Sequence, residues 1–394
     1  MSIDMALVDR VTERLALHGV SPDATAVAAA VRKEGLLLGG PGLLDLVASV
    51  RAELTGLGPL QPLLADPEVS DVLVNRPDEV WVDRGDGLVR AAVSFRDESA
   101  VRRLAQRLAA SAGRRLDVAC PTLDARLADG VRLHVVLPPV SPAGTLISLR
   151  VARRLSFTLA ELVARGTVAP GLDDVLRGLV RARLSFLVTG GTGTGKTTLL
   201  ASLLGLVDPT ERVVLVEDSG ELAPTHPHVV RLEARTANQE GAGAVDLRTL
   251  VREALRMRPD RIVVGEVRGG EVVELLAALN TGHDGSAGTV HASSAGVVPA
   301  RLEALGLAAG LGRDALHSQL SAGVQVVVHL ARGPSGRRVV EEVACLQRRP
   351  DGLVEVVAAV RLDGEVLVPG PACSRLAGLV DGLPAGLVMA RSLG

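Results

Sequence analysis

The spacing of hydrophobic and polar residues changes along the chain, and it separates four regions. In residues 1–55, Val, Leu and Ala recur among Arg, Asp and Glu at helical spacing, with a Gly-Gly-Pro-Gly break at 39–42. This pattern predicts a small helical N-terminal extension. In residues 56–155, short runs typical of strands surround one helix-patterned stretch, which predicts an α+β domain. The strand runs are 71–75, 80–83, 131–137 and 146–151, and the helical stretch is 99–112.

The second half of the chain follows a different pattern. Residues 156–172 hold a short helical pattern and then a Pro-Gly break, and we interpret them as a linker. In residues 173–394, apolar runs at 184–189, 212–217 and 261–266 alternate with helical stretches. Strands buried on both faces have this composition, so the pattern predicts an α/β domain whose parallel sheet carries helices on both faces. For the tail from about residue 332 two interpretations stay open, a mixed β extension and a loosely attached end.

A glycine-rich segment directly follows the first apolar run. It fits G-x-x-x-x-G-K-[ST] and reads Gly190-Gly191-Thr192-Gly193-Thr194-Gly195-Lys196-Thr197, followed by Thr198. Glycines let backbone N–H groups close around phosphate oxygens, and the helix that follows presents its positive end to them. Lys196 would neutralise the β- and γ-phosphates, and the Thr197 hydroxyl would ligate Mg²⁺. The segment predicts an ATP site, and a flexible glycine turn is the weaker alternative.

Two glutamates end the other apolar runs, where an open parallel sheet places its ligands. We interpret Glu266 as a Walker B acid, which either polarises the attacking water or holds a magnesium-bound water. Glu217 ends the run at 212–217 and begins an acidic cluster that continues to Glu221. The same topology would place this cluster beside the phosphate loop. The structural alternatives are a surface carboxylate at 266 and helix capping within the cluster.

Two histidines follow the helical stretch 271–280. His283 and His291 stand eight residues apart, which is a poor signature for a zinc site. We interpret them as a phosphate sensor or a hydrogen-bonding link between sites. An ordinary polar loop is the alternative.

Composition and charge limit the partners. At 394 residues, with 47% hydrophobic and 22% charged residues, the chain has the composition of a protein with two or three packed domains. A net charge of −2 supplies no basic field for nucleic acid or an anionic membrane. Only two of the 43 basic residues are lysines, and one of them is Lys196. Three scattered cysteines, no apparent secretory signal and no long uninterrupted apolar run favour a cytoplasmic protein.

Taken in order, these segments resemble the type II/type IV secretion ATPase superfamily of P-loop NTPases. The segments that carry the resemblance are GGTGTGKTT (190–198), RVVLVEDSGEL (212–222), LRMRPDRIVVGEVRG (255–269) and TGHDGSAGTVHASS (281–294). Within the superfamily, the last two are most similar to the TadA/CpaF type, the motors of Flp/Tad pilus assembly. Residues 58–84 and 124–140 also resemble the N-terminal domain of that group.

The resemblance implies a RecA-like P-loop domain behind a smaller α+β domain, and an ATPase that does mechanical work. It also implies a homo-hexamer, peripheral at the inner face of the cell membrane, that acts on inner-membrane platform proteins and binds nucleotide between its two domains. Arginines would then meet the phosphates, and the candidates are Arg126, Arg132 and Arg150 in the N-terminal domain and Arg231 and Arg235 between the two acidic segments. With 41 arginines in the chain, solvated or structural roles are the alternative.

Three other functions stay open from the sequence. A conjugal-transfer or effector-export ATPase would use the same motifs. A nucleic-acid-dependent motor also has a RecA-like core, but zero tyrosines, three phenylalanines and one tryptophan offer few stacking groups. A catalytically silent nucleotide-binding scaffold is disfavoured because Lys196 and Glu266 are both present.

Overall fold

The computed structural model divides the chain into two units, Met1–Arg153 and Arg154–Gly394. The structure describes residues 10–11, 14–15, 23–34, 42–44, 46–47, 50, 56–85, 87–128, 130–151, 156–235, 242–333, 336–381 and 383. Of the helical extension predicted over 1–55, helix α2 (Ala24–Lys33) is described in full, and Asp23 caps it by accepting a hydrogen bond from the Ala26 N–H at 2.8 Å. The rest of that prediction lies largely outside the described residues.

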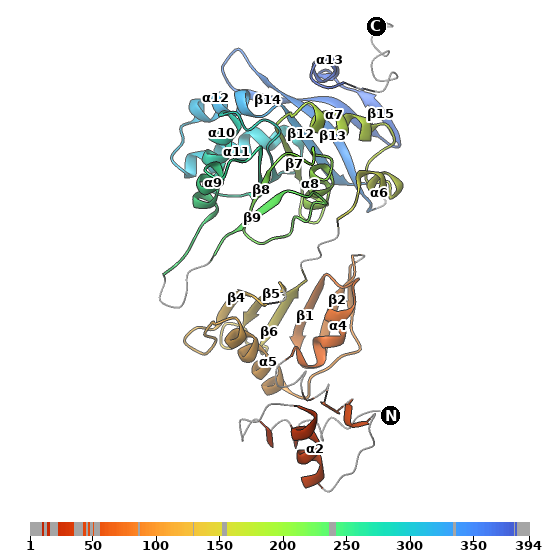
Figure 1. The fold of residues 1–394 in the computed structure, drawn as a ribbon, viewed down its shortest axis with the longest axis vertical. Coiled ribbons are helices and arrows are strands. Elements are labelled where there is room, and N and C mark those ends of the chain that lie inside the picture. The colour runs from red at the N-terminus through yellow and green to blue at the C-terminus, as the bar shows by residue number, and fades with distance from the viewer. Residues whose placement is uncertain are drawn as a thin grey trace. The chain divides into compact units, whose positions relative to one another are not determined.

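The first unit contains an antiparallel sheet covered by one long helix (Figure 1). Its strands occur in the order β3-β2-β1-β6-β5-β4. They are β1 (Asp71–Arg76), β2 (Glu79–Asp83), β3 (Leu88–Arg90), β4 (Thr122–Arg126), β5 (Arg132–Val136) and β6 (Leu146–Arg150). Alternate residues of the central strands are buried, and these pack with α5 (Glu98–Ser111), as expected when one face of a sheet meets the core. The α+β prediction is confirmed.

Three further short elements are helical in this unit and the next. Before β1 come the 3₁₀ turn η1 (Gly58–Leu60) and α4 (Gln61–Ala65). Residues predicted as a linker at 156–172 instead contain α6 (Leu159–Ala164), which begins with a capping box between Thr158 and Glu161. Leu159 and Leu162 are 1% and 3% exposed in the core of the second unit. The short helical pattern predicted within this segment is thus present, and its apolar side chains pack into a core that the local sequence pattern does not reveal.

The second unit is built on a nine-stranded sheet in the order β15-β14-β13-β12-β7-β11-β10-β8-β9 (Figure 1). The described strands β7 to β12 pair in parallel, and β13 to β15 continue the sheet antiparallel. Their bounds are β7 (Phe186–Gly190), β8 (Val213–Glu217), β9 (Val229–Glu233), β10 (Arg261–Val267), β11 (Ala287–His291), β12 (Val326–Arg332), β13 (Arg338–Arg348), β14 (Val354–Asp363) and β15 (Val366–Pro369). In the described part of the tail, β13–β15 thus extend the same sheet.

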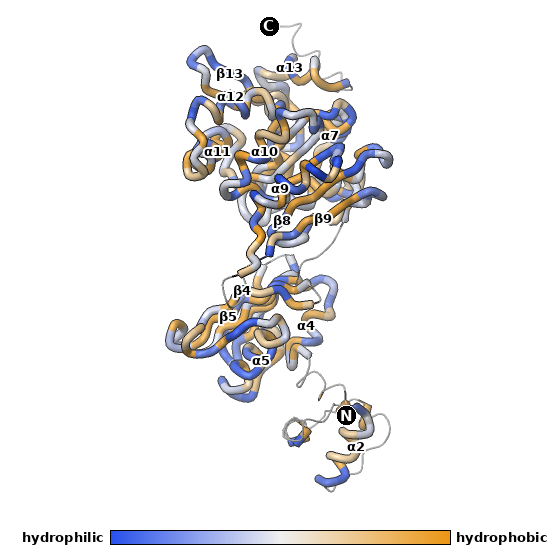
Figure 2. Tube along the Cα trace, turned by 60° about the vertical axis from the view of Figure 1, so that its left-hand side comes forward, coloured by the Kyte–Doolittle hydropathy of each residue, from blue (hydrophilic) through white to orange (hydrophobic). Residues whose placement is uncertain are grey.

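Helices cover both faces of this sheet, as the apolar strand runs predict. Successive residues of β8 alternate between two separate hydrophobic clusters: Val213 and Leu215 belong to one, and Val214 and Val216 to the other. The first cluster includes α6, α7 (Leu172–Arg181), α8 (Lys196–Leu204) and α13 (Cys373–Ala377). The second includes α9 (Leu247–Leu255), α10 (Glu271–Leu279), α11 (Val298–Ala308) and α12 (Arg313–Gly323), and the 3₁₀ turn η2 (Ala295–Val297) precedes α11. Figure 2 shows hydrophobic strand segments separated by hydrophilic stretches of the trace.

Candidate active site

The glycine-rich segment forms the loop between the central strand β7 and helix α8. Gly193 and Gly195 have φ angles of 69° and 94°, a region that residues with a Cβ rarely adopt. The hydroxyl of Thr194 donates to the Gly191 carbonyl oxygen at 2.9 Å and closes the loop from inside. The loop leads directly into the N-terminus of α8, and the first N–H groups of a helix have no acceptor within it, which is the basis of anion binding at a helix N-terminus.

Lys196 lies under this loop and is only 7% exposed. Its Nζ donates to the Gly191 carbonyl oxygen at 2.8 Å and lies 3.4 Å from Nδ1 of His291. Burial lowers the pKa of Lys196, and the carboxylates of Glu266 and Glu221 oppose that shift. The ammonium group is thus held by weak, replaceable neutral partners and nearby negative charge, at the position where phosphate would give it a full counter-charge.

His291 connects Lys196 to Glu266. It ends β11 and pairs with Gly190, so it stands beside the start of the loop. Burial and the Lys196 charge lower the pKa of His291, which favours its neutral form. An ammonium group has no lone pair, so Nδ1 must accept from Lys196, and the ring proton then lies on Nε2. That nitrogen is 3.2 Å from Oε1 of Glu266, and it donates to the carboxylate.

Glu217 lies at the same edge of the sheet, at the end of β8. Its Oε1 accepts from the N–H groups of Glu221 at 3.0 Å and Leu222 at 2.8 Å, while its buried Oε2 has no hydrogen-bond partner among the residues that the structure describes. Burial raises its pKa to about 7. A Cβ on Gly265 would stand 2.7 Å from the Glu217 Cγ, so glycine is needed there to let the two strands carry this carboxyl group between them.

The structure does not bring His283 to this group. His283 precedes β11, and its Nδ1 lies 3.2 Å from the Ala278 carbonyl oxygen at the end of α10. His291 is the last residue of β11, so the two histidines lie at opposite ends of this strand. Among the described residues, His291 contacts Lys196 and Glu266, whereas His283 contacts Thr281 and the Ala278 carbonyl oxygen.

Arg231 and Arg235 lie at the far side of the sheet. Arg231 is in the edge strand β9 and donates to the Leu222 carbonyl oxygen at 3.4 Å, and Arg235 donates to that of Gly243 at 2.7 Å. Four strand intervals separate β9 from β7, which amounts to about 19 Å at the usual spacing. Within one chain, neither arginine is brought to Lys196.

The three N-terminal arginines form a row in the first unit. Arg126 pairs with Arg132 across β4 and β5, and Arg132 pairs with Arg150 across β5 and β6, so their side chains share one face of the sheet. Asp71 accepts from Arg150 at 2.9 Å, and Asp124 lies 3.7 Å from Arg132. The sequence motifs did not reveal this alignment, because the strands concerned are joined only by their register.

Sequence reasoning missed His329, which lies in β12 beside the phosphate-loop strand. It is 2% exposed, its Nδ1 is 2.9 Å from the Thr189 hydroxyl, and burial lowers its pKa. Thr189 is the residue directly before Gly190, so His329 supports the base of the loop. A second missed contact joins Arg268, just beyond Glu266, to Asp218. No motif marks His329, since a histidine in an apolar run reads as an ordinary core residue.

None of the described helices is both long and apolar enough to cross a membrane. The described His, Cys, Asp and Glu side chains form no group of three or more that would hold a metal ion by themselves.

Comparison with known proteins agrees with this geometry. The family model described as "Type II/IV secretion system protein" matches residues 53–365. The chain is 58% identical over 333 residues to the putative conjugal transfer protein Rv3659c of Mycobacterium tuberculosis, covering 83% of this chain and 94% of that protein. It is 31% identical over 317 residues to the type IV secretion system protein VirB11 of Brucella suis, covering 72% and 88%.

Solved structures agree on the fold. The Yersinia pseudotuberculosis ATPase DotB superposes with a TM-score of 0.52 at 18% identity, covering 74% of this chain and 78% of that one. The second unit is a RecA-like P-loop domain, and the smaller α+β unit precedes it as in these ATPases. Because the family model spans more than half of the sequence, and relatives above 30% identity cover most of it, the chain belongs to the type II/IV secretion system protein family.

Proposed function

We propose that this protein hydrolyses ATP and uses the energy to drive a secretion, conjugation or pilus-assembly apparatus. The observation that carries the proposal is the chain of contacts from the phosphate loop through Lys196 and His291 to Glu266. It joins a group suited to bind phosphate with a carboxylate suited to orient water, and both lie at the carboxyl edge of a parallel sheet, where such folds bind ligands.

Each residue has a distinct role in this proposal. The glycine-rich loop, residues 190–198, surrounds the phosphates, and Lys196 neutralises them. Glu266 acts as the general base toward the attacking water, because it is accessible and carries one hydrogen bond from His291. When Lys196 turns from His291 to a γ-phosphate, His291 loses its Lys196 contact, and the orientation of Glu266 becomes sensitive to what the loop holds.

The residues at the site fit a magnesium ion. Thr197 is the second residue of α8, Glu266 is partly exposed, and the buried Glu217 Oε2 has no hydrogen-bond partner among the described residues. These three side chains offer oxygen ligands, which Mg²⁺ prefers. In this proposal Thr197 and Glu266 hold the ion, Glu266 through a water. Bound Mg²⁺ would neutralise charge on the phosphates.

The transported substrate is the finer part of the proposal. The wording of the segments at 255–269 and 281–294 favours Flp/Tad-type pilus assembly. The relatives named for conjugal transfer and type IV secretion favour the alternative, a motor for conjugation or effector export. Either motor would work as a homo-hexamer with inner-membrane platform proteins, peripheral to the cytoplasmic face of the membrane. Neighbouring genes for prepilins and platform proteins support the first, and a neighbouring relaxase gene supports the second.

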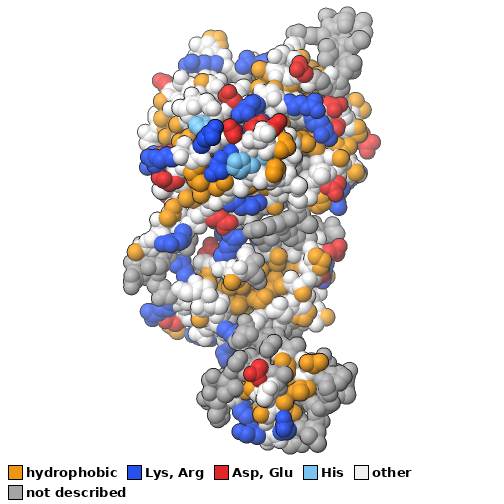
Figure 3. Space-filling view, in the orientation of Figure 1, with side chains coloured by type: hydrophobic (Ala, Val, Ile, Leu, Met, Phe, Trp, Pro, Cys, Tyr) orange, Lys and Arg blue, Asp and Glu red, His pale blue; other side chains and the backbone are white. Residues whose placement is uncertain are grey.

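The arginine row of the first unit is proposed to add positive charge around the bound phosphates. Charge that develops on phosphoryl oxygens in the transition state needs cationic stabilisation, and arginines supply it in related chemistry. Arg150 is the exposed member of the row, and its pair with Asp71 is partly open to solvent, so its exchange for a phosphate contact costs little. We expect no direct binding of nucleic acid. Acidic and basic side chains are interspersed on the face of the second unit that Figure 3 shows, and nucleic-acid binding favours a clustered basic surface.

The decisive experiment compares two variants in ATP turnover and nucleotide affinity. Lys196→Ala should abolish tight binding and reduce turnover by at least about 100-fold, because the phosphates lose their buried counter-charge. Glu266→Gln should keep nucleotide affinity and lose turnover to a similar extent, because the amide keeps the shape but cannot accept the proton. Wild-type turnover in Lys196→Ala would disprove the assignment of residues 190–198 as the nucleotide-binding loop. Equal loss of affinity in Glu266→Gln would make Glu266 structural and turn attention to Glu217.

A further inference from the structure

The hairpin between β12 and β13 brings two arginines to the phosphate loop. Leu330 of β12 pairs with Gly190, and β12 continues to Arg332, which pairs with Arg338 directly across the hairpin. Side chains of such a pair leave the sheet on one face. That face carries the loop: Arg332 Nη2 donates to the Gly193 carbonyl oxygen at 3.3 Å, and Arg338 Cδ lies 3.6 Å from where a Cβ on Gly195 would stand.

These two guanidinium groups are not neutralised by acidic side chains in the described part of the chain. Arg332 donates to the carbonyl oxygens of Gly193 and Gly336, and neither arginine forms an ion pair with a described carboxylate. Like charges directly opposite each other in a hairpin are unfavourable. Lys196 adds a third positive charge at the same loop. An anion on the loop would relieve the mutual repulsion of these three groups.

We propose that Arg332 and Arg338 are nucleotide-binding residues that supply positive charge to the phosphates of ATP and ADP. This inference rests on the proposed function, since it requires the loop to hold a nucleotide. Both side chains are exposed, so they can adjust to a ligand without disturbing the core. The antiparallel extension β13–β15 then does more than widen the sheet, because it anchors the strand that presents Arg338 to the loop.

Arg337 offers a matched control in the same turn. It is also an exposed arginine, but its Nη1 lies 3.3 Å from where a Cβ on Gly166 would stand, just beyond α6, and not at the phosphate loop. Arg337→Gln removes the same charge from the same segment as Arg332→Gln or Arg338→Gln. It therefore separates a local effect at the loop from a change in the overall charge.

The test is calorimetric titration of the full-length chain with ADP and Mg²⁺. Arg332→Gln and Arg338→Gln should each raise Kd about three- to tenfold and the double variant more, while Arg337→Gln stays within about twofold of wild type. Unchanged melting temperatures without nucleotide are expected, since both positions are exposed. Wild-type affinity in the double variant, or an equal loss in Arg337→Gln, would overturn the proposal.

Lys196→Ala, titrated in parallel, keeps the two proposals separable. If Lys196→Ala loses ADP binding while the arginine double variant does not, the nucleotide site stands and the role of Arg332 and Arg338 falls. If Lys196→Ala binds ADP like the wild type, the nucleotide site itself is wrong, and the arginine proposal falls with it.

Discussion

Glu217 shows how a single buried carboxyl group can be placed for chemistry at a cost in stability. It is 3% exposed, one oxygen accepts hydrogen bonds from two backbone N–H groups, and the other has no partner in the described part of the chain. Burial raises its pKa from 4.5 to about 7, and the neighbouring carboxylates of Glu221 and Glu233 act in the same direction. In the unfolded chain the group would ionise near its ordinary pKa, so the unfolded state binds fewer protons between these two values.

The free energy of unfolding should therefore fall as pH rises from about 4.5 to about 7, and this cost should be fully present above pH 7. Glu217→Gln removes the titration and should be more stable than the wild type at pH 8, by up to about 3 kcal/mol. At pH 5 the two should differ much less. Urea unfolding at both pH values checks this, followed by circular dichroism because the single tryptophan, Trp81, lies in the first unit.

A change in the free energy of unfolding on Glu217→Gln that is the same at pH 5 and at pH 8 would contradict this account. The amide would then act through packing, and ionisation of Glu217 would have little part in the difference. A part in the proposed ATP hydrolysis would explain why such a group is kept. A carboxyl group with a raised pKa beside a phosphate site can exchange a proton near neutral pH, which an exposed glutamate cannot do efficiently.

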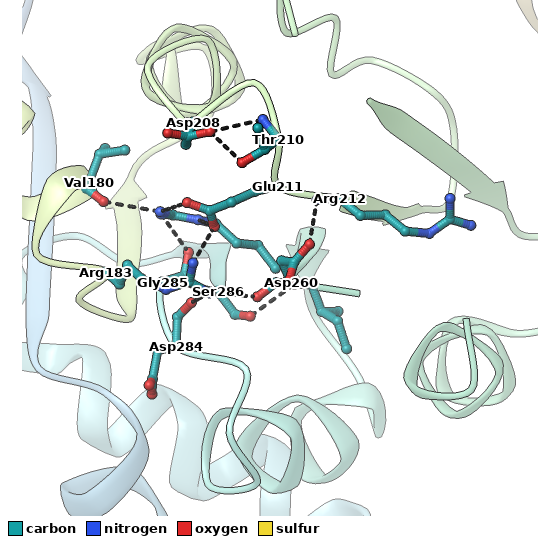
Figure 4. A network of polar contacts seen from close by, with 12 residues as sticks. Val180, Arg183, Asp208, Thr210, Glu211, Arg212, Asp260, Asp284, Gly285 and Ser286 are labelled. Carbon is teal, nitrogen blue, oxygen red and sulfur yellow. Dashed lines mark hydrogen bonds and ion pairs between the residues drawn. The ribbon is translucent and has the colours of Figure 1, made fainter. Parts of the chain in front are cut away.

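At the scale of elements, the amino and carboxyl ends of the parallel strands have different roles. At the amino ends, a network of polar contacts joins the start of β10 to the segments before β8 and β11 and to α7 (Figure 4). Arg261, the first residue of β10, is 2% exposed and contacts Glu211 through two hydrogen bonds of 2.8 and 3.0 Å. Arg183 joins the same carboxylate at 2.7 Å. The contacts at the amino ends stabilise the sheet, and the carboxyl ends carry the candidate active site.

Removing one partner of that buried pair should destabilise the second unit strongly. Glu211→Ala leaves the Arg261 charge buried without its carboxylate, and we expect a loss of about 3 kcal/mol in the free energy of unfolding. Glu253→Ala is the control, because its pair with Arg256 on α9 is exposed, 55% and 71% at the two side chains, and should change stability by less than about 0.5 kcal/mol. Equal effects in urea unfolding would show that the network contributes no more than a surface pair.

At the scale of the whole molecule, the position of β9 bears on assembly. Arg231 and Arg235 lie at a free edge of the described sheet, four strands from the phosphate loop of their own chain. If they act on nucleotide at all, they must act on the site of another subunit. A monomer would then lack part of the charge stabilisation of its own site.

Hydrolysis per subunit should therefore rise with protein concentration and level off when assembly is complete. ATPase rates over a concentration series, measured beside analytical ultracentrifugation, test this. Arg231→Ala should lower the plateau by roughly 10-fold or more if it stabilises the transition state of a neighbouring site. A fully active, strictly monomeric species would remove the oligomeric motor from consideration.

Local motifs were sufficient to predict much of this protein. The glycine-rich loop, the strand ends at Glu217 and Glu266, and the change from an α+β to an α/β pattern are encoded within short segments, because backbone geometry and burial impose them locally. The strands and helices predicted from these patterns occur within two residues of the observed bounds. The family was identifiable for the same reason.

Contacts between distant segments were decided only by the tertiary structure. The sequence treats His283 and His291 alike, but β11 separates them, and only the residue paired with Gly190 reaches Lys196. Residues predicted as a linker became part of a core because their apolar side chains meet helices and strands from elsewhere in the chain. The arginines at 332 and 338 carry no motif, and hairpin register alone places them beside the loop. Short segments specify their own conformation, whereas which segments become neighbours depends on the order and register of the strands, which no local pattern contains.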